Sequence, residues 1–348
     1  MSKKAKAVVL ISGGLDSLLA AKVIQDQGVY VEGINFYTGF CVEGHTHAIR
    51  KKDKNKDKRN NALWVAEQLG IKLHIIDIVE DYKQIVINPK HGYGANLNPC
   101  LDCKIFMVKQ AHDWMEENDF DFIVTGEVVG QRPKSQRKET MRVVVKESGV
   151  ANRLLRPLSA KNLAKTYAEE QGYVKREELY DFSGRSRKPQ MALAAELGFT
   201  DYAQPAGGCC FLTDKSYSNK LADLWQHRGE KIYELDDIML LKVGRHLRPN
   251  ERFKMIISRE EGENQFLYGY RKQFISMQTT DVAGPFALID GAPNEQDLLL
   301  AGQLLGRFGQ GKNQEQISID MRLKDGVNKT IKVAPLSAEA IPKSWYLL

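Results

Sequence analysis

Apolar runs alternate with amphipathic segments over the first third of the chain. The runs are apolar at successive positions, which is typical of strands buried on both faces, whereas the amphipathic segments carry apolar residues at helical spacing. This alternation of strand and helix predicts a parallel sheet covered by helices. The expected strands are 6–11, 29–37, 72–79 and 120–125, and the expected helices are 16–27, 62–69, 80–88 and 101–118.

The pattern changes after Asp214, where short strand candidates are separated by turns that contain Gly, Pro or Asn. The expected strands here are 238–243, 253–258, 266–270, 316–323 and 330–334, with a helix over 295–308. We therefore predict two domains. An α/β domain with a doubly wound parallel sheet covers residues 1–214, and a second, smaller α+β domain covers residues 215–348.

The composition is that of a soluble globular protein, since 43% of the 348 residues are hydrophobic and 27% are charged. No apolar stretch is long enough to span a bilayer, and the basic N-terminus is followed by only a short apolar segment, unlike a cleaved signal. We expect a cytoplasmic protein without a membrane span. The net charge of +6 modestly favours an anionic partner such as nucleic acid. A basic run over residues 50–59 is either a solvated loop or an arm that contacts phosphate.

The segment Ser-Gly-Gly-Leu-Asp-Ser joins the first expected strand to the first expected helix. Backbone N–H groups at the start of a helix lack carbonyl partners, and glycines let phosphate oxygens approach them, so this loop predicts a pyrophosphate site. An acidic side chain here, Asp16, suggests that Mg²⁺ lies between it and the phosphates. The alternative is a glycine turn that only joins strand to helix. The predicted nucleotide-binding residues of the loop are Ser12, Gly13, Gly14, Leu15, Asp16 and Ser17.

This loop lacks the lysine of the GxxxxGK[ST] motif, and it resembles the signature of the N-type ATP pyrophosphatases, the PP-loop enzymes of the adenine nucleotide alpha hydrolase-like type. The resemblance covers residues 1 to about 210. It implies that ATP is split into AMP and pyrophosphate while a carbonyl oxygen is activated as an adenylate. It also implies that Asn35 and Phe36, at the end of the second strand, hold the adenine, and that Gly126 lies beside the nucleotide.

Five cysteines occur in a chain without an export signal, which favours reduced thiols, metal ligands or redox groups over a disulfide framework. Cys100 and Cys103 lie on the first turn of an expected helix, whose N-terminus is expected to lower the thiol pKa. One of Cys209 and Cys210 is expected to join them, because neighbouring side chains on an extended chain point to opposite faces. Three thiolates fit an iron–sulfur cluster or a catalytic zinc, and buried or disulfide-forming thiols are the alternative.

A Pro-preceded CxxC with a distant cysteine in an adenylating domain resembles the tRNA thiolases, some of which hold a [4Fe–4S] cluster on three cysteines. Pro99-Cys-Leu-Asp-Cys103 and Gly208-Cys-Cys-Phe211 also resemble segments that flank the active site of the tRNA 2-thiouridylases. That resemblance pairs Cys103 and Cys210 with the two cysteines of the family, and Cys100 with its aspartate. The thiolase resemblance implies a three-cysteine cluster, and with the preference for Cys210 its ligands are Cys100, Cys103 and Cys210, with Cys209 as the alternative; Cys41 is expected to be a plain thiol.

Further segments suit catalysis or RNA. Leu155-Arg-Pro-Leu158 recurs in thiolases, so Arg156 is expected to neutralise phosphate charge in the transition state. The segment 125–136 follows a buried strand beside the ATP loop, and 183–190 is a basic loop at a helix start, although either could be an ordinary basic loop. Leu240–Arg248 resembles the RNA-binding domain of NFACT proteins. The predicted RNA-binding residues are Arg132, Lys134, Arg185, Arg187, Lys188, Lys242, Arg245, His246 and Arg248.

We therefore predict an ATP-dependent sulfurtransferase that adenylates a carbonyl of a base in tRNA, a uridine by preference, and replaces the oxygen with sulfur held on a [4Fe–4S] cluster. Asp16, Cys103, Cys210 and Arg156 are the expected catalytic residues, and the expected cofactors are ATP, Mg²⁺ and the cluster, with zinc as the alternative. Expected partners are tRNA and a sulfide or persulfide donor, and a homodimer is left open. The alternatives are a persulfide relay without a cluster, an ATP-dependent amide- or nitrile-forming ligase with structural zinc, and a nonenzymatic RNA-binding protein.

Overall fold

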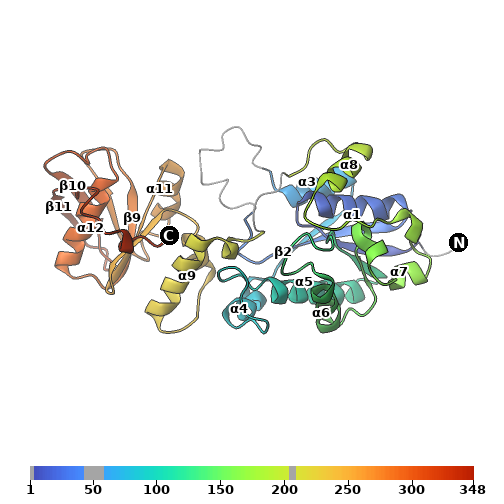
Figure 1. Ribbon diagram of the computed structural model, residues 1–348. Helices are drawn as coiled ribbons and strands as arrows, with labels where there is room; N and C mark the ends of the chain where they lie inside the picture. Colours follow the sequence, from blue (N-terminus) through green and yellow to red (C-terminus); the bar gives the residue numbers. More distant parts are fainter. Residues whose placement is uncertain (1–3, 43–58, 204–208) are drawn as a thin grey trace. The chain divides into compact units, whose positions relative to one another are not determined.

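The computed structural model describes residues 4–42, 59–203 and 209–348, which form two compact units (Figure 1). The first unit comprises the described residues up to Cys41 and from Arg59 to Cys209, and the second comprises Val42 and residues 210–348. No helix in these parts of the chain is long and apolar enough to cross a membrane. The predicted basic run lies outside the described residues except for Arg59. The predicted domain boundary after residue 214 stays a proposal.

The first unit contains a five-stranded parallel sheet, which confirms the predicted fold class. Its strands lie in the order β3-β2-β1-β4-β5. Successive residues of β1 point into two different cores, since Ala7 and Val9 belong to one and Val8 to the other. The strands are β1 (Lys6–Leu10), β2 (Tyr30–Tyr37), β3 (Leu73–Asp77), β4 (Phe122–Val124) and β5 (Leu154–Leu155).

Helices cover both faces of this sheet (Figure 1). α1, α3 and α8 contribute side chains to one core, and α5 and α6 contribute to the other. The apolar periodicity along the chain is thus satisfied on both sides of the strands. The helices are α1 (Leu15–Asp26), α3 (Asn61–Leu69), α4 (Val79–Ile87), α5 (Cys100–Glu117), α6 (Lys138–Ser148), α7 (Tyr167–Glu170) and α8 (Lys188–Glu196).

The strand order reverses direction between β1 and β4, which pair with Ala7 opposite Phe122. The chain moves outward through β2 and β3 on one side and through β5 on the other. The loops that follow β1 and β4 therefore leave the same edge of the sheet side by side. Ligands of open α/β sheets bind at such a position.

The second unit is built on a six-stranded sheet in the order β11-β10-β8-β9-β7-β6, with antiparallel pairing throughout. α12 packs on one face, and α10 and α11 pack on part of the other face. The elements are α9 (Lys215–Arg228), α10 (Leu235–Leu240), β6 (Arg245–Asn250), β7 (Phe253–Ile257), α11 (Glu261–Tyr268), β8 (Ile275–Thr279), β9 (Phe286–Gly291), α12 (Glu295–Arg307), β10 (Ile317–Arg322) and β11 (Asn328–Val333).

Two of the predicted strands in this unit are wrong, because residues 238–243 and 266–270 fall largely on α10 and α11. A capping box between Glu234 and Asp237 fixes the start of α10, and a short apolar run behind it does not by its pattern distinguish helix from strand. The prediction also missed β6, β8 and β9. The predicted helix at 295–308 and the strands at 253–258, 316–323 and 330–334 are confirmed.

Candidate active site

The loop between β1 and α1 has the backbone of an anion site. Gly13 adopts φ +79°, a left-handed conformation that side chains rarely take, and helix α1 begins at Leu15 directly after Gly14. Glycine at this position provides no capping side chain, so the first N–H groups of the helix remain directed outward. The Ser17 hydroxyl donates to the Gly14 carbonyl at 2.8 Å, which fixes the first turn. The loop is thus shaped as the sequence predicts.

Asp16 lies at the centre of a small polar network. Its Oδ2 accepts hydrogen bonds from Gln131 Nε2 at 2.9 Å and from Arg187 Nη2 at 3.0 Å. Its buried Oδ1 accepts no hydrogen bond from the described residues. Such a carboxylate oxygen is a suitable ligand for a Mg²⁺ ion, and the outward-directed N–H groups beside it suit the phosphate that would accompany the ion. Arg187, predicted to contact RNA, is here the ion-pair partner of this carboxylate.

Gly126 holds the loop after β4 against the start of α1. A Cβ atom at this position would lie 2.3 Å from the Asp16 carbonyl oxygen and 2.6 Å from the Ser17 nitrogen. Only glycine permits this approach, because such distances lie far inside van der Waals contact. The structure thus gives Gly126 a packing role at the loop; its predicted nucleotide contact stays a prediction.

The residues predicted to hold adenine lie at the end of β2. The Asn35 side chain donates from Nδ2 to the Ile11 carbonyl at 2.7 Å and ties β2 to the end of β1. Phe36 is 6% exposed and packs in the core on the α5 side of the sheet. The Phe36 ring is therefore committed to the core, and adenine binding by these two residues stays a prediction.

The thiols of the CxxC segment lie at the beginning of α5, which starts at Cys100. Burial, together with the neighbouring Cys209 and Cys100 side chains, raises the pKa of Cys103 to about 12. A hydrogen bond with Tyr82 acts in the opposite direction but is weaker. The prediction of a lowered pKa is therefore wrong for Cys103, because desolvation and like charges outweigh the helix N-terminus.

Arg132 connects these thiols with Asp16. Partial desolvation acts against the charge of its guanidinium, but the Cys209 side chain, with which it forms a hydrogen bond, outweighs this effect and raises its pKa. Cys100 and Asp16 act in the same direction. One cation thus interacts with the CxxC segment, the second cysteine segment and the predicted ATP loop.

The three-cysteine metal site predicted from Cys100, Cys103 and Cys210 receives no support. In the described residues, no group of three or more His, Cys, Asp or Glu side chains is arranged to hold a metal ion. Cys209 belongs to the first unit and is exposed, whereas Cys210 begins the second unit, where its carbonyl accepts a hydrogen bond from the Thr213 hydroxyl at 2.8 Å. We therefore assign no reaction step to a cluster or to zinc.

Arg156 is 4% exposed and forms a buried ion pair, with its Nε 3.0 Å from Glu127 Oε2. Lys104 Nζ lies 3.7 Å from the other carboxylate oxygen. Burial acts to raise the pKa of Glu127, but the charges of Lys104 and Arg156 outweigh it and hold the pKa below its usual value. Arg156 therefore has a buried carboxylate partner, and its predicted contact with phosphate stays a prediction.

A cavity of about 300 Å³ opens beside Cys100 and is lined by Lys134 and Arg137. Lys134 was among the predicted RNA-binding residues, whereas Arg137, Glu127 and Lys104 were missed. The sequence could have indicated Glu127. An acidic residue that follows a buried strand closely, at the edge where ligands of such sheets bind, is expected to have a charged partner. Predicted RNA contacts Arg185 and Lys188 are exposed on the loop before α8 and at its first residue.

Two of the RNA contacts predicted around residues 242–248 fall on buried side chains. Lys242 and His246 are 4% and 2% exposed, so neither side chain faces solvent. Arg248 is paired with Asp223 at 2.5 Å, and Arg245 donates to the Ser258 carbonyl at 3.1 Å. Lys242 and His246 therefore belong to the interior of the second unit, whereas Arg245 and Arg248 are partly exposed and their RNA contacts stay a prediction.

Two family models match the chain. The model described as "tRNA methyl transferase HUP domain" matches residues 5–177, and the model described as "NFACT protein RNA binding domain" matches residues 244–346. These ranges lie in the first and second unit respectively. The matched families agree with the resemblances noted in the sequence.

The individual proteins that are similar to this chain share only a modest fraction of its residues. A tRNA-specific 2-thiouridylase MnmA from Cytophaga hutchinsonii is 28% identical over 235 residues, which cover 62% of this chain and 57% of that protein. A protein of the same name from Pelobacter propionicus is 25% identical, with 77% and 67% covered. A solved structure described as a predicted subunit of tRNA methyltransferase from Methanocaldococcus jannaschii is 14% identical with a TM-score of 0.36, and covers 67% of this chain and 91% of that one. The chain thus spans 57% to 67% of the two named 2-thiouridylases.

Proposed function

Because residues 5–177 belong to the tRNA methyl transferase HUP domain family and residues 244–346 to the NFACT protein RNA binding domain family, we propose that the protein is an ATP-dependent tRNA sulfurtransferase. It would replace a carbonyl oxygen of a uridine with sulfur. The observation that carries the proposal is that Cys209, Cys100 and Asp16 all act electrostatically on one guanidinium, that of Arg132. ATP activation and sulfur chemistry require these two groups in one site.

The first step is adenylation of the base. The N–H groups of the loop between β1 and α1 bind phosphate oxygens, and the unpaired Oδ1 of Asp16 suits the accompanying Mg²⁺. Gln131 and Arg187 fix the orientation of this carboxylate. The carbonyl oxygen of the uridine attacks the α-phosphorus, the α–β bond breaks, and pyrophosphate leaves. The base then carries AMP as its leaving group.

The second step is sulfur transfer through a persulfide on Cys209 or Cys210. The terminal sulfur attacks the activated carbon, the bond from carbon to the AMP oxygen breaks, and AMP leaves. Cys103 then attacks the carrier sulfur, and the electron pair of the S–S bond goes to the product sulfur, which takes the proton of the Cys103 thiol. A disulfide between the two cysteines remains, and a thiol reductant must reduce it before the next turnover. The attack requires the Cys103 thiolate, so its proton must leave as the new S–S bond forms; the pKa of about 12 keeps this thiol protonated and unreactive before that stage.

Other elements of the proposal concern partners and place. tRNA is the acceptor, a protein persulfide is the sulfur donor, and the cytoplasm is the location. The persulfide route is preferred to the cluster because the described residues hold no three-ligand group. An amide- or nitrile-forming ligase is less well supported, since it gives residues 244–346 no use.

The test follows pyrophosphate release and thiolated nucleosides separately, with purified full-length protein, tRNA, ATP, and a cysteine desulfurase with cysteine as persulfide source. Asp16→Asn should lose both readouts. Cys103→Ser should keep tRNA-stimulated pyrophosphate release but form no thiouridine, and comparison of Cys209→Ser with Cys210→Ser identifies the carrier. Cys41→Ser is the matched control, since Cys41 is not among the thiols that affect Cys103. Absence of tRNA-stimulated pyrophosphate release in the wild type would refute the proposal.

A further inference from the structure

The sheet of the second unit has a polar face that its helices cover only in part. In β8 and β10, alternate residues such as Met277 and Met321 point into the core under α12, so that Ser276, Gln278 and Arg322 point the other way. On this other face α11 packs with the residues of β9, in a cluster that includes Leu267. The strands β8, β10 and β11 continue beyond that cluster with polar side chains.

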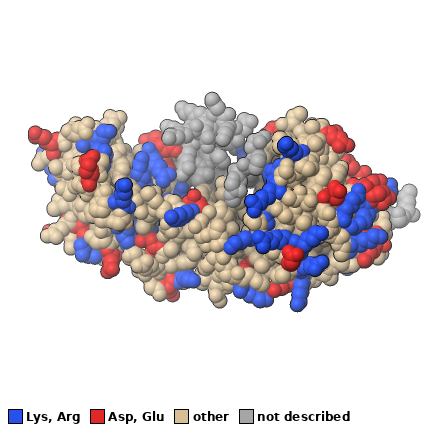
Figure 2. All heavy atoms as spheres, viewed as in Figure 1, with Lys and Arg blue, Asp and Glu red and all other residues tan. Residues whose placement is uncertain are grey.

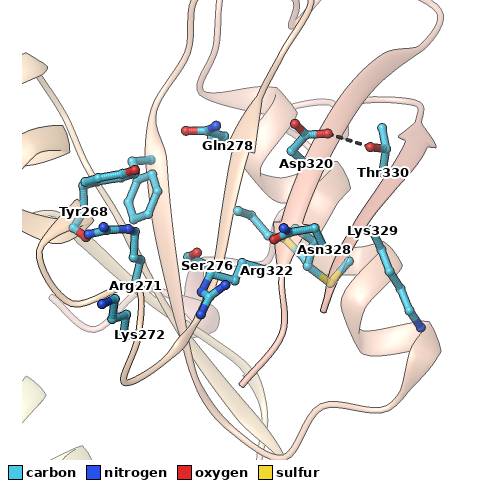
Figure 3. Close-up of a pocket in the computed structure, with 13 residues that line it drawn as sticks. Tyr268, Arg271, Lys272, Ser276, Gln278, Asp320, Arg322, Asn328, Lys329 and Thr330 are labelled. Carbon is cyan, nitrogen blue, oxygen red and sulfur yellow. Dashed lines mark hydrogen bonds between the residues drawn. The ribbon is translucent and has the colours of Figure 1, made fainter. Parts of the chain in front are cut away.

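A cavity of about 500 Å³ lies at this place, between the end of α11 and the three strands (Figure 3). Tyr268, Arg271 and Lys272 line one side, and Gln278, Arg322 and Asn328 line the other. Figure 3 shows Lys329 extending away from these side chains. Lys329 pairs with the core residue Met321 on the neighbouring strand, and paired residues point to the same face of the sheet. The Lys329 side chain therefore points away from the cavity and only its base lies at the rim.

The cavity is positively charged. Arg271, Lys272 and Arg322 outnumber the single lining carboxylate among these side chains, that of Asp320, which also accepts a hydrogen bond from the Thr330 hydroxyl at 2.7 Å. On the face that Figure 2 shows, Lys and Arg are interspersed with Asp and Glu over both units. The charge inside the cavity therefore favours an anionic occupant.

The cavity also offers a stacking surface. The Tyr268 side chain is 45% exposed, and the guanidinium carbon of Arg271 lies 4.0 Å from the centre of its ring. An edge-on contact with Phe286, at 5.5 Å between ring centres, holds the ring in place. Unpaired bases stack on aromatic rings and on guanidinium planes, whereas the paired bases of a duplex cannot reach such a surface. Gln278 and Asn328 add amides that can hydrogen-bond base edges.

We propose that this cavity binds unpaired nucleotides of the RNA substrate, with a base stacked on the Tyr268–Arg271 pair and phosphates held by Lys272 and Arg322. This inference rests on the proposed function, because it takes RNA to be the substrate, and it places RNA binding in the second unit at a different position from the buried Lys242 and His246. The match of residues 244–346 to an RNA-binding family favours RNA over an acidic protein.

The test is a fluorescence anisotropy titration of the full-length protein with a labelled short single-stranded RNA and with a duplex of equal length, repeated at several salt concentrations. The charge variant Lys272→Gln/Arg322→Gln should bind the single strand more weakly, and its slope of log affinity against log salt should fall by about 1.4, or about 0.7 per cation. Lys312→Gln/Lys343→Gln removes two exposed charges of the same unit that do not line the cavity, and it should behave as the wild type.

The stacking variant Tyr268→Leu should weaken single-strand binding by about 5- to 150-fold, and Tyr268→Phe should preserve it. Circular dichroism checks the fold, and the charge variant tests the cavity even if Tyr268→Leu does not fold. Wild-type affinity in the charge variant, or an equal loss for the duplex, would overturn the inference.

The thiolation assay separates this inference from the proposed function. The charge variant should raise KM for tRNA and leave kcat unchanged, because the cavity does not contain the reacting groups. If the wild type thiolates tRNA and the charge variant has an unchanged KM, the inference fails and the function stands. If the wild type does not release pyrophosphate with tRNA, the function fails.

Discussion

Cys103 should be the slowest-reacting thiol of its group at neutral pH. A pKa of about 12 in place of 9.0 reduces the fraction of thiolate by about 1000-fold below both values, since each pH unit is a factor of ten. The thiolate is the species that reacts with iodoacetamide, but its intrinsic nucleophilicity rises with its pKa. The alkylation rate of Cys103 should therefore lie about 30- to 60-fold below that of an unperturbed thiol. Burial is the main cause, with the Cys209 side chain second.

Substitution of Cys209, the second cause of the raised pKa, gives a sharper test. Cys209→Ser removes a like charge, so the pKa of Cys103 should fall and its alkylation should accelerate at alkaline pH. Tyr82→Phe removes a hydrogen bond that lowers this pKa, and it should slow alkylation further. Cys41→Ser should leave the rate unchanged. The two substitutions near Cys103 thus have effects of opposite sign.

The assay follows alkylation of each cysteine by peptide mass spectrometry at quenched time points over a series of pH values. The pH at which the Cys103 rate reaches half its plateau gives its pKa. An apparent pKa near 9.0 for Cys103, or a slower reaction in Cys209→Ser, would refute the reasoning. The sulfur-transfer step would then need a different account of how Cys103 stays protonated.

Three further outcomes are expected. Gly126→Ala should destabilise the protein by about 1–3 kcal/mol and impair ATP binding, because its Cβ would lie 2.3 Å from the Asp16 carbonyl oxygen. Thermal melting and calorimetric titration measure the two effects; an unchanged melting temperature would contradict the packing role, and an unchanged ATP affinity would contradict the link to the nucleotide loop. Glu127→Gln should cost about 3–5 kcal/mol in urea unfolding, since it leaves the charge of Arg156 buried. The folded pKa of Glu127 is lowered, so its contribution exists above the unfolded value of about 4.3 and is lost as the pH falls below it, and the variant should be less acid-sensitive in that range. Burial lowers the pKa of His246, so below about pH 6.5 the unfolded chain binds a proton that the folded chain does not bind. The free energy of unfolding should therefore decrease as the pH falls below that value, and His246→Gln should lose this pH dependence.

Much of the fold of the first unit could be predicted from local patterns in the sequence. The apolar runs were long enough to mark β1 and β2, and the Ser-Gly-Gly-Leu-Asp-Ser segment carried the shape of its own loop. These signals are local, because a strand that is buried on both faces and a glycine with positive φ leave their mark at the residues concerned.

The partners of the site residues could not be predicted in the same way. Arg187 reaches Asp16 across 171 positions of the chain, so no short segment could indicate the pair. In the second unit, the segment around Lys242 and His246 was correctly seen as basic, but composition does not say which side of a segment faces the core. The polar side chains there satisfy internal acceptors such as the Val243 carbonyl, which His246 contacts at 2.9 Å.

The contact of Gly126 with the first turn of α1 has a consequence for the order of folding. The loop at residues 12–17 leaves the ribosome before the strand that supports it, because β4 is made more than a hundred residues later. The nucleotide site therefore cannot form on the nascent chain when its signature is synthesised, because it depends on a contact of long sequence separation. ATP binding by this protein should thus report on completion of the whole first unit, and a truncated chain that ends before β4 should carry the motif without the site.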